Sequence, residues 1–262
     1  MAVGGRAMIY RRAAAKLRAQ DWTAIGIELV IVVVGVFIGM WVADWNQERT
    51  ERANTIRLLN QFKPELRWQF DQYRRLKAYM ATTGDYAQIA LKGWRNDPSV
   101  SDRQFVIAAY QASQATGSVT NTQTWADIFG SNQVQNIGDP VLRSRLIRVL
   151  SIDSSLTDYR QIQSAYRENV RHVIPNDVQD RIRRQCGDRL LGDDFGIYYL
   201  PPNCDVDLSA EQVSAAAAAL RAHPSLVSDL NWHEALVATM LINWQLYIKS
   251  LEQLSKAIDR HS

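Results

Sequence analysis

Residues 22–45 read WTAIGIELVIVVVGVFIGMWVADW, and this apolar run decides how the chain is organised. From Ala24 to Ala43 only one side chain, that of Glu28, is ionisable. A helix rises 1.5 Å per residue, so about 20 residues cross a hydrocarbon core of about 30 Å. The sequence therefore predicts one membrane-spanning helix at residues 22–45, and no second stretch of this kind follows in the 262 residues.

The charges on the two sides of this run predict its orientation. Before Asp21 the chain carries cationic residues and no acidic one, whereas after the run acidic and basic residues alternate. Lys and Arg are retained on the cytoplasmic side of membrane helices, which makes residues 1–21 a basic cytoplasmic tail and residues 46–262 an exported domain. The tail is expected to contact anionic lipid headgroups. Trp41 stands where a signal-peptide cleavage site needs a small side chain, which favours an uncleaved anchor.

Aromatic residues mark both ends of the predicted span. Trp22 lies at one end, and Trp41 and Trp45 lie one helical turn apart at the other. Tryptophan rings favour the membrane–water interface because they are apolar with one polar group. Asn46 and Arg49 follow directly. These five residues are interpreted as an interfacial anchor, with a docking edge for another membrane protein as the alternative.

One face of the predicted span combines an acid with small residues. At 100° per residue Glu28, Gly35 and Gly39 fall on the same side, and Ala43 extends the pattern. Small residues spaced by four let two membrane helices approach closely, and a carboxylate within a bilayer is costly without a partner. We expect this face to bind an integral membrane protein or a second copy of the chain. The alternative is that Glu28 reaches lipid headgroups and the glycines have no partner.

Helical periodicity dominates the exported part and predicts an all-α fold. The membrane helix is expected to continue outward with an apolar stripe spaced by three and four. This stripe comprises Ile56, Leu59, Phe62, Leu66, Phe70, Tyr73 and Leu76. Pro64 lies within it and predicts a kink or a new helix start. Ser101 is a plausible cap for the next helix.

Three further helices complete a predicted antiparallel bundle on a membrane stalk. One long helix is expected from Asp139 and Pro140 to Pro175, and an alanine-rich helix from about Ser209 to Leu220. Another long helix is expected in the C-terminal part after Pro224, with Ser225 as its cap.

The two cysteines of the chain, Cys186 and Cys204, both lie in the predicted exported part. An even count in an oxidising compartment predicts a disulfide, which would close a loop rich in Gly and Asp. The loop also contains the apolar residues Phe195, Tyr198 and Tyr199, followed by two prolines. These rings either fold back on the bundle or contact a partner.

The sequence offers little support for catalysis. His233-Glu234 begins like a zinc-protease motif, but Val237 stands where the second histidine belongs. No phosphate-binding glycine loop or nucleophile elbow is present, and the acidic residues near the cysteines match no calcium loop. A net charge of +3, much of it in the tail, indicates no nucleic-acid surface. We expect no enzyme activity, no cofactor and no metal.

The stretch ELVIVVVGVFIGMWVADWNQER, residues 28–49, resembles the signature of a family of uncharacterised single-pass bacterial membrane proteins. That family has a Glu, an aliphatic run with an internal Gly, and a terminal W-N-E-E-R-like motif. The stretch WADIFGSNQVQNIGDPVLR, residues 125–143, is similar to a second family motif, except that Gly130-Ser131-Asn132 replaces a Ser-Gly turn. The resemblance implies a bacterial membrane anchor with a helical exported domain and no established activity.

These observations predict a non-enzymatic accessory or scaffolding subunit. It would lie in the bacterial inner membrane with its C-terminal domain in the periplasm, and it would bind another integral membrane protein. The alternative is an exported ligand-sensing domain that acts through a partner, because a tail of about 20 residues holds no signalling domain.

Overall fold

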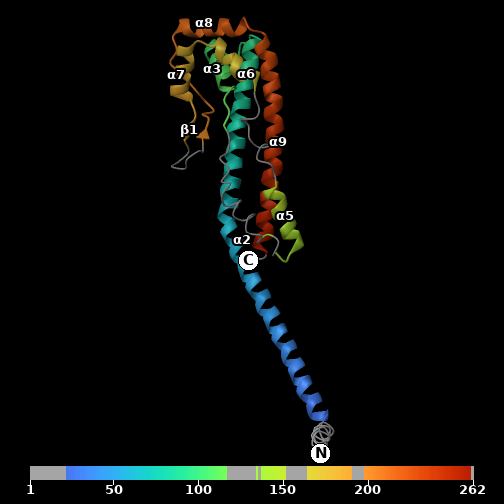
Figure 1. Ribbon diagram of the computed structural model, residues 1–262. Coiled ribbons are helices and arrows are strands. Elements are labelled where there is room, and N and C mark those ends of the chain that lie inside the picture. Colours follow the sequence, from blue (N-terminus) through green and yellow to red (C-terminus); the bar gives the residue numbers. More distant parts are fainter. Residues whose placement is uncertain (1–21, 117–133, 135–136, 152–163, 191–197, 261–262) are drawn as a thin grey trace, which may run out of the picture. The chain divides into compact units, whose positions relative to one another are not determined.

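The computed structural model describes residues 22–116, 134, 137–151, 164–190 and 198–260. The protein is all-α, with seven helices in these ranges (Figure 1). They are α2 (Trp22–Trp94), α3 (Asp102–Gln111), α5 (Pro140–Leu150), α6 (Ala165–Val173), α7 (Asn176–Cys186), α8 (Ala210–Arg221) and α9 (Ser225–Asp259). Two-residue strands, β1 (Arg189–Leu190) and β2 (Tyr198–Tyr199), form an antiparallel pair. The chain divides into two compact units, residues 1–54 and 55–262.

Helix α2 is 73 residues long and contains both the apolar run and the start of the bundle. It continues through Pro64, so the predicted new helix start at this position is wrong. The missing backbone donor of a proline is tolerated here because the neighbouring Phe62 and Leu66 are buried and hold the helix in the core. The helix ends at Trp94, and Asn96 then adopts a positive φ of 54° that reverses the chain.

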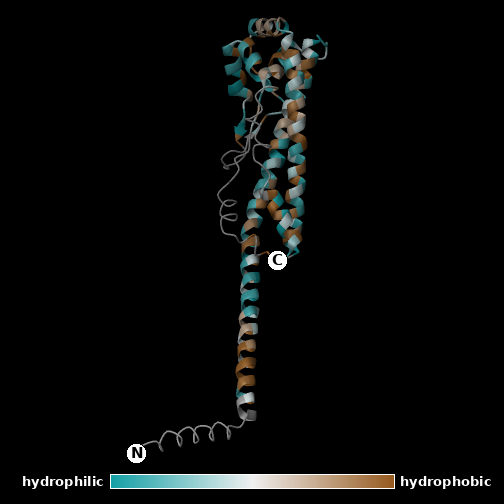
Figure 2. Ribbon diagram, turned by 45° about the vertical axis from the view of Figure 1, so that its right-hand side comes forward, coloured by the Kyte–Doolittle hydropathy of each residue, from teal (hydrophilic) through white to brown (hydrophobic). Residues whose placement is uncertain are grey.

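The first part of α2 is apolar and exposed. Every described side chain from Gly26 to Asn54 is exposed. The apolar stretch within this part is a candidate membrane span, and no other helix among the described residues is both long and apolar enough for that role. Figure 2 shows it as a continuous hydrophobic stretch that gives way to a hydrophilic one.

The second unit is built on α9 and the later part of α2, which lie side by side in both views (Figures 1 and 2). Trp244 of α9 is fully buried with its ring edge-on to Tyr73 of α2, at 6.3 Å between centroids. Tyr247 packs on the same tyrosine at 4.7 Å and donates a hydrogen bond to Gln69. Helix α5 packs against α9, where Arg145 donates to the Gln253 carbonyl. Packing of these aromatic rings therefore joins α2 to α9.

Helices α3, α6, α7 and α8 gather around the end of α2 and the start of α9 (Figure 1). Trp94 of α2 packs edge-on against Phe105 of α3 and donates a hydrogen bond to the Leu220 carbonyl of α8. Gly93 is needed here, because a Cβ at this position would overlap the Phe105 ring. A small residue thus lets α3 pack directly on α2.

Helix ends follow local sequence signals in three cases. Ser101 and Ser209 form capping boxes with a glutamine three residues later, and Asp139 caps α5 with Pro140 at the first helical position. The expected cap Ser225 is instead the first residue of α9 and follows Pro224.

The single long helix expected from Asp139 to Pro175 is wrong. Helix α5 ends at Leu150, and α6 starts only at Ala165. Ser164, which precedes α6, has an extended backbone with φ −110° and ψ 114°. The described ends of this stretch therefore lie in two separate helices, and residues 152–163 lie outside the described residues. Helix α7 was not expected, because its sequence has few apolar residues.

Candidate functional site

The glycine face of the membrane-span candidate has no partner among the described residues. Glu28, Gly35, Gly39 and Ala43 all lie in α2 and are exposed. A Cβ added at Gly35 or Gly39 would have no described atom within 4 Å, apart from the helix's own backbone. The backbone is therefore open to a second helix at two positions about one turn apart, which is the geometry that close helix packing in a membrane requires.

The predicted interfacial anchor lies directly after this face on α2. Trp41 and Trp45 are 73% and 59% exposed. The guanidinium of Arg49 lies over the Trp45 ring, 6.0 Å from its centroid. Asn46 accepts a hydrogen bond from Thr50 through its backbone carbonyl. Trp22 is the first residue of α2, and its side chain lies outside the described part of the structure.

Cys186 and Cys204 form a disulfide with Cα atoms 5.7 Å apart. It joins the end of α7 to the segment that leads into α8, and hydrogen bonds reinforce the junction. Gln111 donates to the Cys186 carbonyl at 2.6 Å, and Tyr86 donates to the Pro201 carbonyl at 2.6 Å. The disulfide therefore joins the two ends of the loop, and the two hydrogen bonds fasten these ends to α3 and α2.

The apolar residues of this loop are only partly described. Tyr199 in β2 is 38% exposed, whereas the next residue, Leu200, is buried. Phe195 lies outside the described residues, and of Tyr198 only the backbone position in β2 is described. The neighbouring Leu190 of β1 is also exposed. The described part of the hairpin thus has one buried anchor and two exposed apolar side chains.

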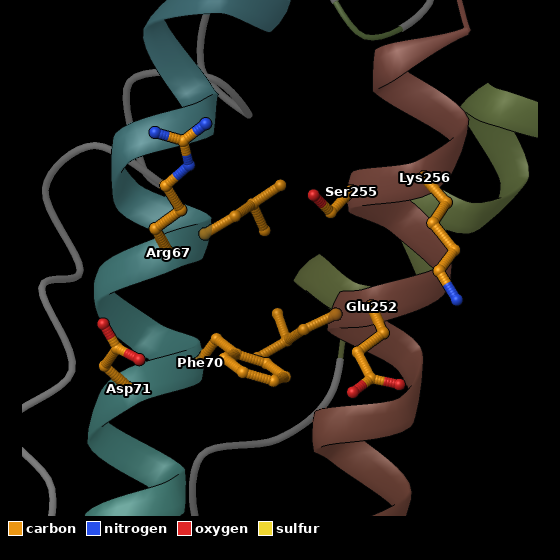
Figure 3. Close-up of a pocket in the computed structure, with 8 residues that line it drawn as sticks. Arg67, Phe70, Asp71, Glu252, Ser255 and Lys256 are labelled. Atoms are coloured by element: carbon orange, nitrogen blue, oxygen red, sulfur yellow. The ribbon is translucent and has the colours of Figure 1, made fainter.

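A groove of about 370 Å³ lies between α2 and α9 (Figure 3). Its lining is apolar at Leu66, Phe70 and Leu251, with Ser255 on α9. Four charged side chains surround it: Arg67 and Asp71 from α2, and Glu252 and Lys256 from α9. A groove with an apolar lining and charged residues around it can bind amphipathic molecules. Its volume is within the range of small-ligand sites.

A polar cluster was missed by the sequence analysis. His233 of α9 is buried, and its Nδ1 lies 2.8 Å from the Ser164 hydroxyl, while its Nε2 has no partner among the described atoms. Glu234 points toward α2, where a Cβ on Gly84 would lie 3.7 Å from Oε2. The sequence places His233 and Glu234 side by side on α9, but it does not show that Ser164, 69 residues earlier, contacts His233.

Burial shifts the pKa values of both neighbours toward their neutral forms. Desolvation raises the pKa of Glu234 to about 7 and lowers that of His233 to about 4, where the charge of Arg167 also contributes. Desolvation and the nearby Glu234 raise the pKa of Tyr166 well above its usual range. The cluster is uncharged at pH 6, which suits an internal position.

We expect Glu234→Gln to stabilise the protein at high pH only. Between pH 4.5 and 7 the unfolded state ionises Glu234 while the folded state keeps its proton, so stability falls as pH rises. Allowing for solvent screening, the glutamine variant should gain about 1–2 kcal/mol at pH 8 and nothing below pH 4.5. Urea unfolding across this range measures the difference.

The exposed Glu252→Gln provides the control and should change stability little at either pH. His233 acts in the opposite direction, because its lowered pKa makes stability fall as pH drops from 6.5 to 4. The effects of Glu234 and His233 on stability oppose each other in the wild type. The Glu234→Gln variant should therefore show the rise in stability with pH that His233 causes. An unchanged pH profile in Glu234→Gln would contradict the assignment.

Comparisons with protein-family models, with curated proteins and with solved structures gave no match.

Proposed function

We propose that this protein is a non-enzymatic, membrane-anchored accessory or scaffolding subunit that binds another integral membrane protein. Its anchor would be the apolar part of α2 in a bacterial inner membrane, with the N-terminus in the cytoplasm and the helical unit in the periplasm. The basic residues before the span support this orientation. The Cys186–Cys204 disulfide supports an oxidising compartment.

The observation that carries the proposal is the open glycine face of α2. Gly35 and Gly39 expose backbone that no described residue covers. Lipid tails fill such a notch poorly, whereas a second helix can pack into it and gain van der Waals contact. Glu28 on the same face adds a carboxylate that a polar or cationic group of a partner helix would satisfy. Both features suit protein contact better than lipid contact.

The test combines gentle extraction with a change to this face. In the chain bearing a C-terminal tag, Gly35→Ile together with Gly39→Ile fills the notch and should lower recovery of a stoichiometric membrane partner at least tenfold. Recovery is measured by size exclusion and mass spectrometry. The matched control, Val30→Ile with Val33→Ile, adds methyl groups to the opposite side of the helix and should leave recovery unchanged. Equal recovery from both variants would reject the proposal.

A second candidate function, an exported ligand sensor, is favoured by the groove between α2 and α9. Its 370 Å³ and mixed charges would suit a small amphipathic ligand. A ligand that binds only the folded state raises the melting temperature by an amount that grows with the logarithm of its concentration above Kd. A ligand-dependent shift that Phe70→Ala abolishes would favour the sensor, whereas a stable membrane complex without such a shift would favour the scaffold.

A further inference from the structure

Helix α9 is apolar on two sides, and only one of them is covered by described residues. From Ala235 to Ile248 the helix carries no charged side chain. Its inner side includes Leu230, Val237 and Trp244, which are buried in the core. A helix that is apolar all round normally has neighbours all round. We therefore expect the opposite side of α9 to contact a partner.

We define the outer face of α9 as Trp232, Ala235, Thr239, Ile242 and Leu246, which are all exposed. The three large apolar residues of this face, Trp232, Ile242 and Leu246, are 62%, 62% and 60% exposed. The spacing alternates between three and four residues, which is the repeat that brings two helices together along a seam. The face continues over about four turns.

We propose that the outer face of α9 binds the outer face of α9 in a second copy of this chain. A two-fold contact requires a surface that accepts itself, and this face meets that condition because it carries no charge that would repel its equivalent. The large Trp232 lies at one end of the face and the large Ile242 and Leu246 at the other, with the small Ala235 and Thr239 between them. Two such helices can therefore approach closely at the centre and pack their large side chains at the ends.

The size of the face indicates where this contact would form. A stable dimer in solution buries about 800 Å² per partner, which exceeds what one helix face of four turns supplies. Two copies anchored in one membrane are already close, and this raises their effective concentration enough for a small interface to be occupied. The inference thus rests on the membrane anchoring in the proposed function, but not on the partner of the glycine face.

Cysteine cross-linking of the full chain in its native membrane tests the contact. Both native cysteines are in the disulfide, so Thr239→Cys introduces one free thiol at the centre of the face. Upon mild oxidation it should form a species of twice the chain mass at least ten times faster than Ser214→Cys, a control at an exposed position of α8. Equal rates, or an adduct of another mass, would overturn the inference.

A second change separates specific contact from chance collision. Ile242→Lys alters an exposed residue, so the melting temperature should be unchanged, but two lysines on facing helices should reduce Thr239→Cys cross-linking at least tenfold. Cross-linking that persists with Ile242→Lys would also overturn the inference. Recovery of the membrane partner tests the glycine face independently. If the partner is recovered but no α9 dimer forms, this inference alone is rejected. If the α9 dimer forms but the partner is not recovered, the proposed function alone is rejected.

Discussion

Trp244→Ala is expected to destabilise the helical unit by about 3–5 kcal/mol. The indole is fully buried against the Tyr73 ring, where α9 meets α2, so alanine would leave a cavity that two long helices cannot easily close. A change of one kcal/mol shifts the melting temperature of a domain of this size by about 2–4 °C, so a decrease of roughly 6–20 °C should result. Thermal unfolding followed by circular dichroism measures it.

Trp232→Ala on the same helix is the matched control. Its side chain is 62% exposed, so in dilute, detergent-solubilised protein its removal should change stability by less than about 0.5 kcal/mol. Comparable losses in the two variants would contradict the assignment of an inner and an outer side of α9. The pair thus tests the orientation of the helix, on which the core and the proposed self-contact both depend.

Removal of the disulfide is expected to cost about 3 kcal/mol. Cys186→Ala with Cys204→Ala releases a loop with a sequence separation of 18, which allows the unfolded chain more conformations. Hydrogen bonds such as that from Gln111 to the Cys186 carbonyl would remain but would hold the segment less firmly. Urea unfolding of the double variant and the wild type measures the difference.

Chemical reduction provides the control for this experiment. A thiol-free reductant should lower the stability of the wild type to that of the double variant and should leave the double variant unaffected. A wild type that unfolds at the same urea concentration in either redox state would show that the hydrogen bonds alone hold the loop in place.

Much of the fold could be predicted because its signals are local. Ser101 and Ser209 predicted helix starts correctly, since each cap binds a backbone group only three residues away. The apolar stripe of α2 predicted buried residues such as Leu59 and Tyr73, because a period of 3.6 places them on one side. Of the two outcomes predicted for Pro64, the new helix start is wrong, because a proline indicates only a local cost and the packing that offsets this cost comes from elsewhere in the chain.

The candidate sites also divide into those that local sequence predicts and those that depend on tertiary contacts. The glycine face depends only on the rotation of 100° per residue in a helix, so Gly35 and Gly39 could be identified from the sequence. The groove between α2 and α9 joins residues such as Phe70 and Leu251, which are far apart in the sequence. The outer face of α9 also escaped prediction, because a sequence shows that a residue is apolar but not which apolar residues are covered.

By itself the sequence determined the all-α class, the candidate membrane span and the cysteine pair, since length, period and composition are properties of neighbouring residues. Only the tertiary structure decided that α2 is one helix through Pro64, and that α5 and α6 are separate. It also decided that burial shifts the pKa values of His233 and Glu234 toward their neutral forms. Burial depends on contacts between segments that are distant in the sequence. These contacts determine whether a local cost such as that of Pro64 is offset and whether a buried side chain keeps its charge.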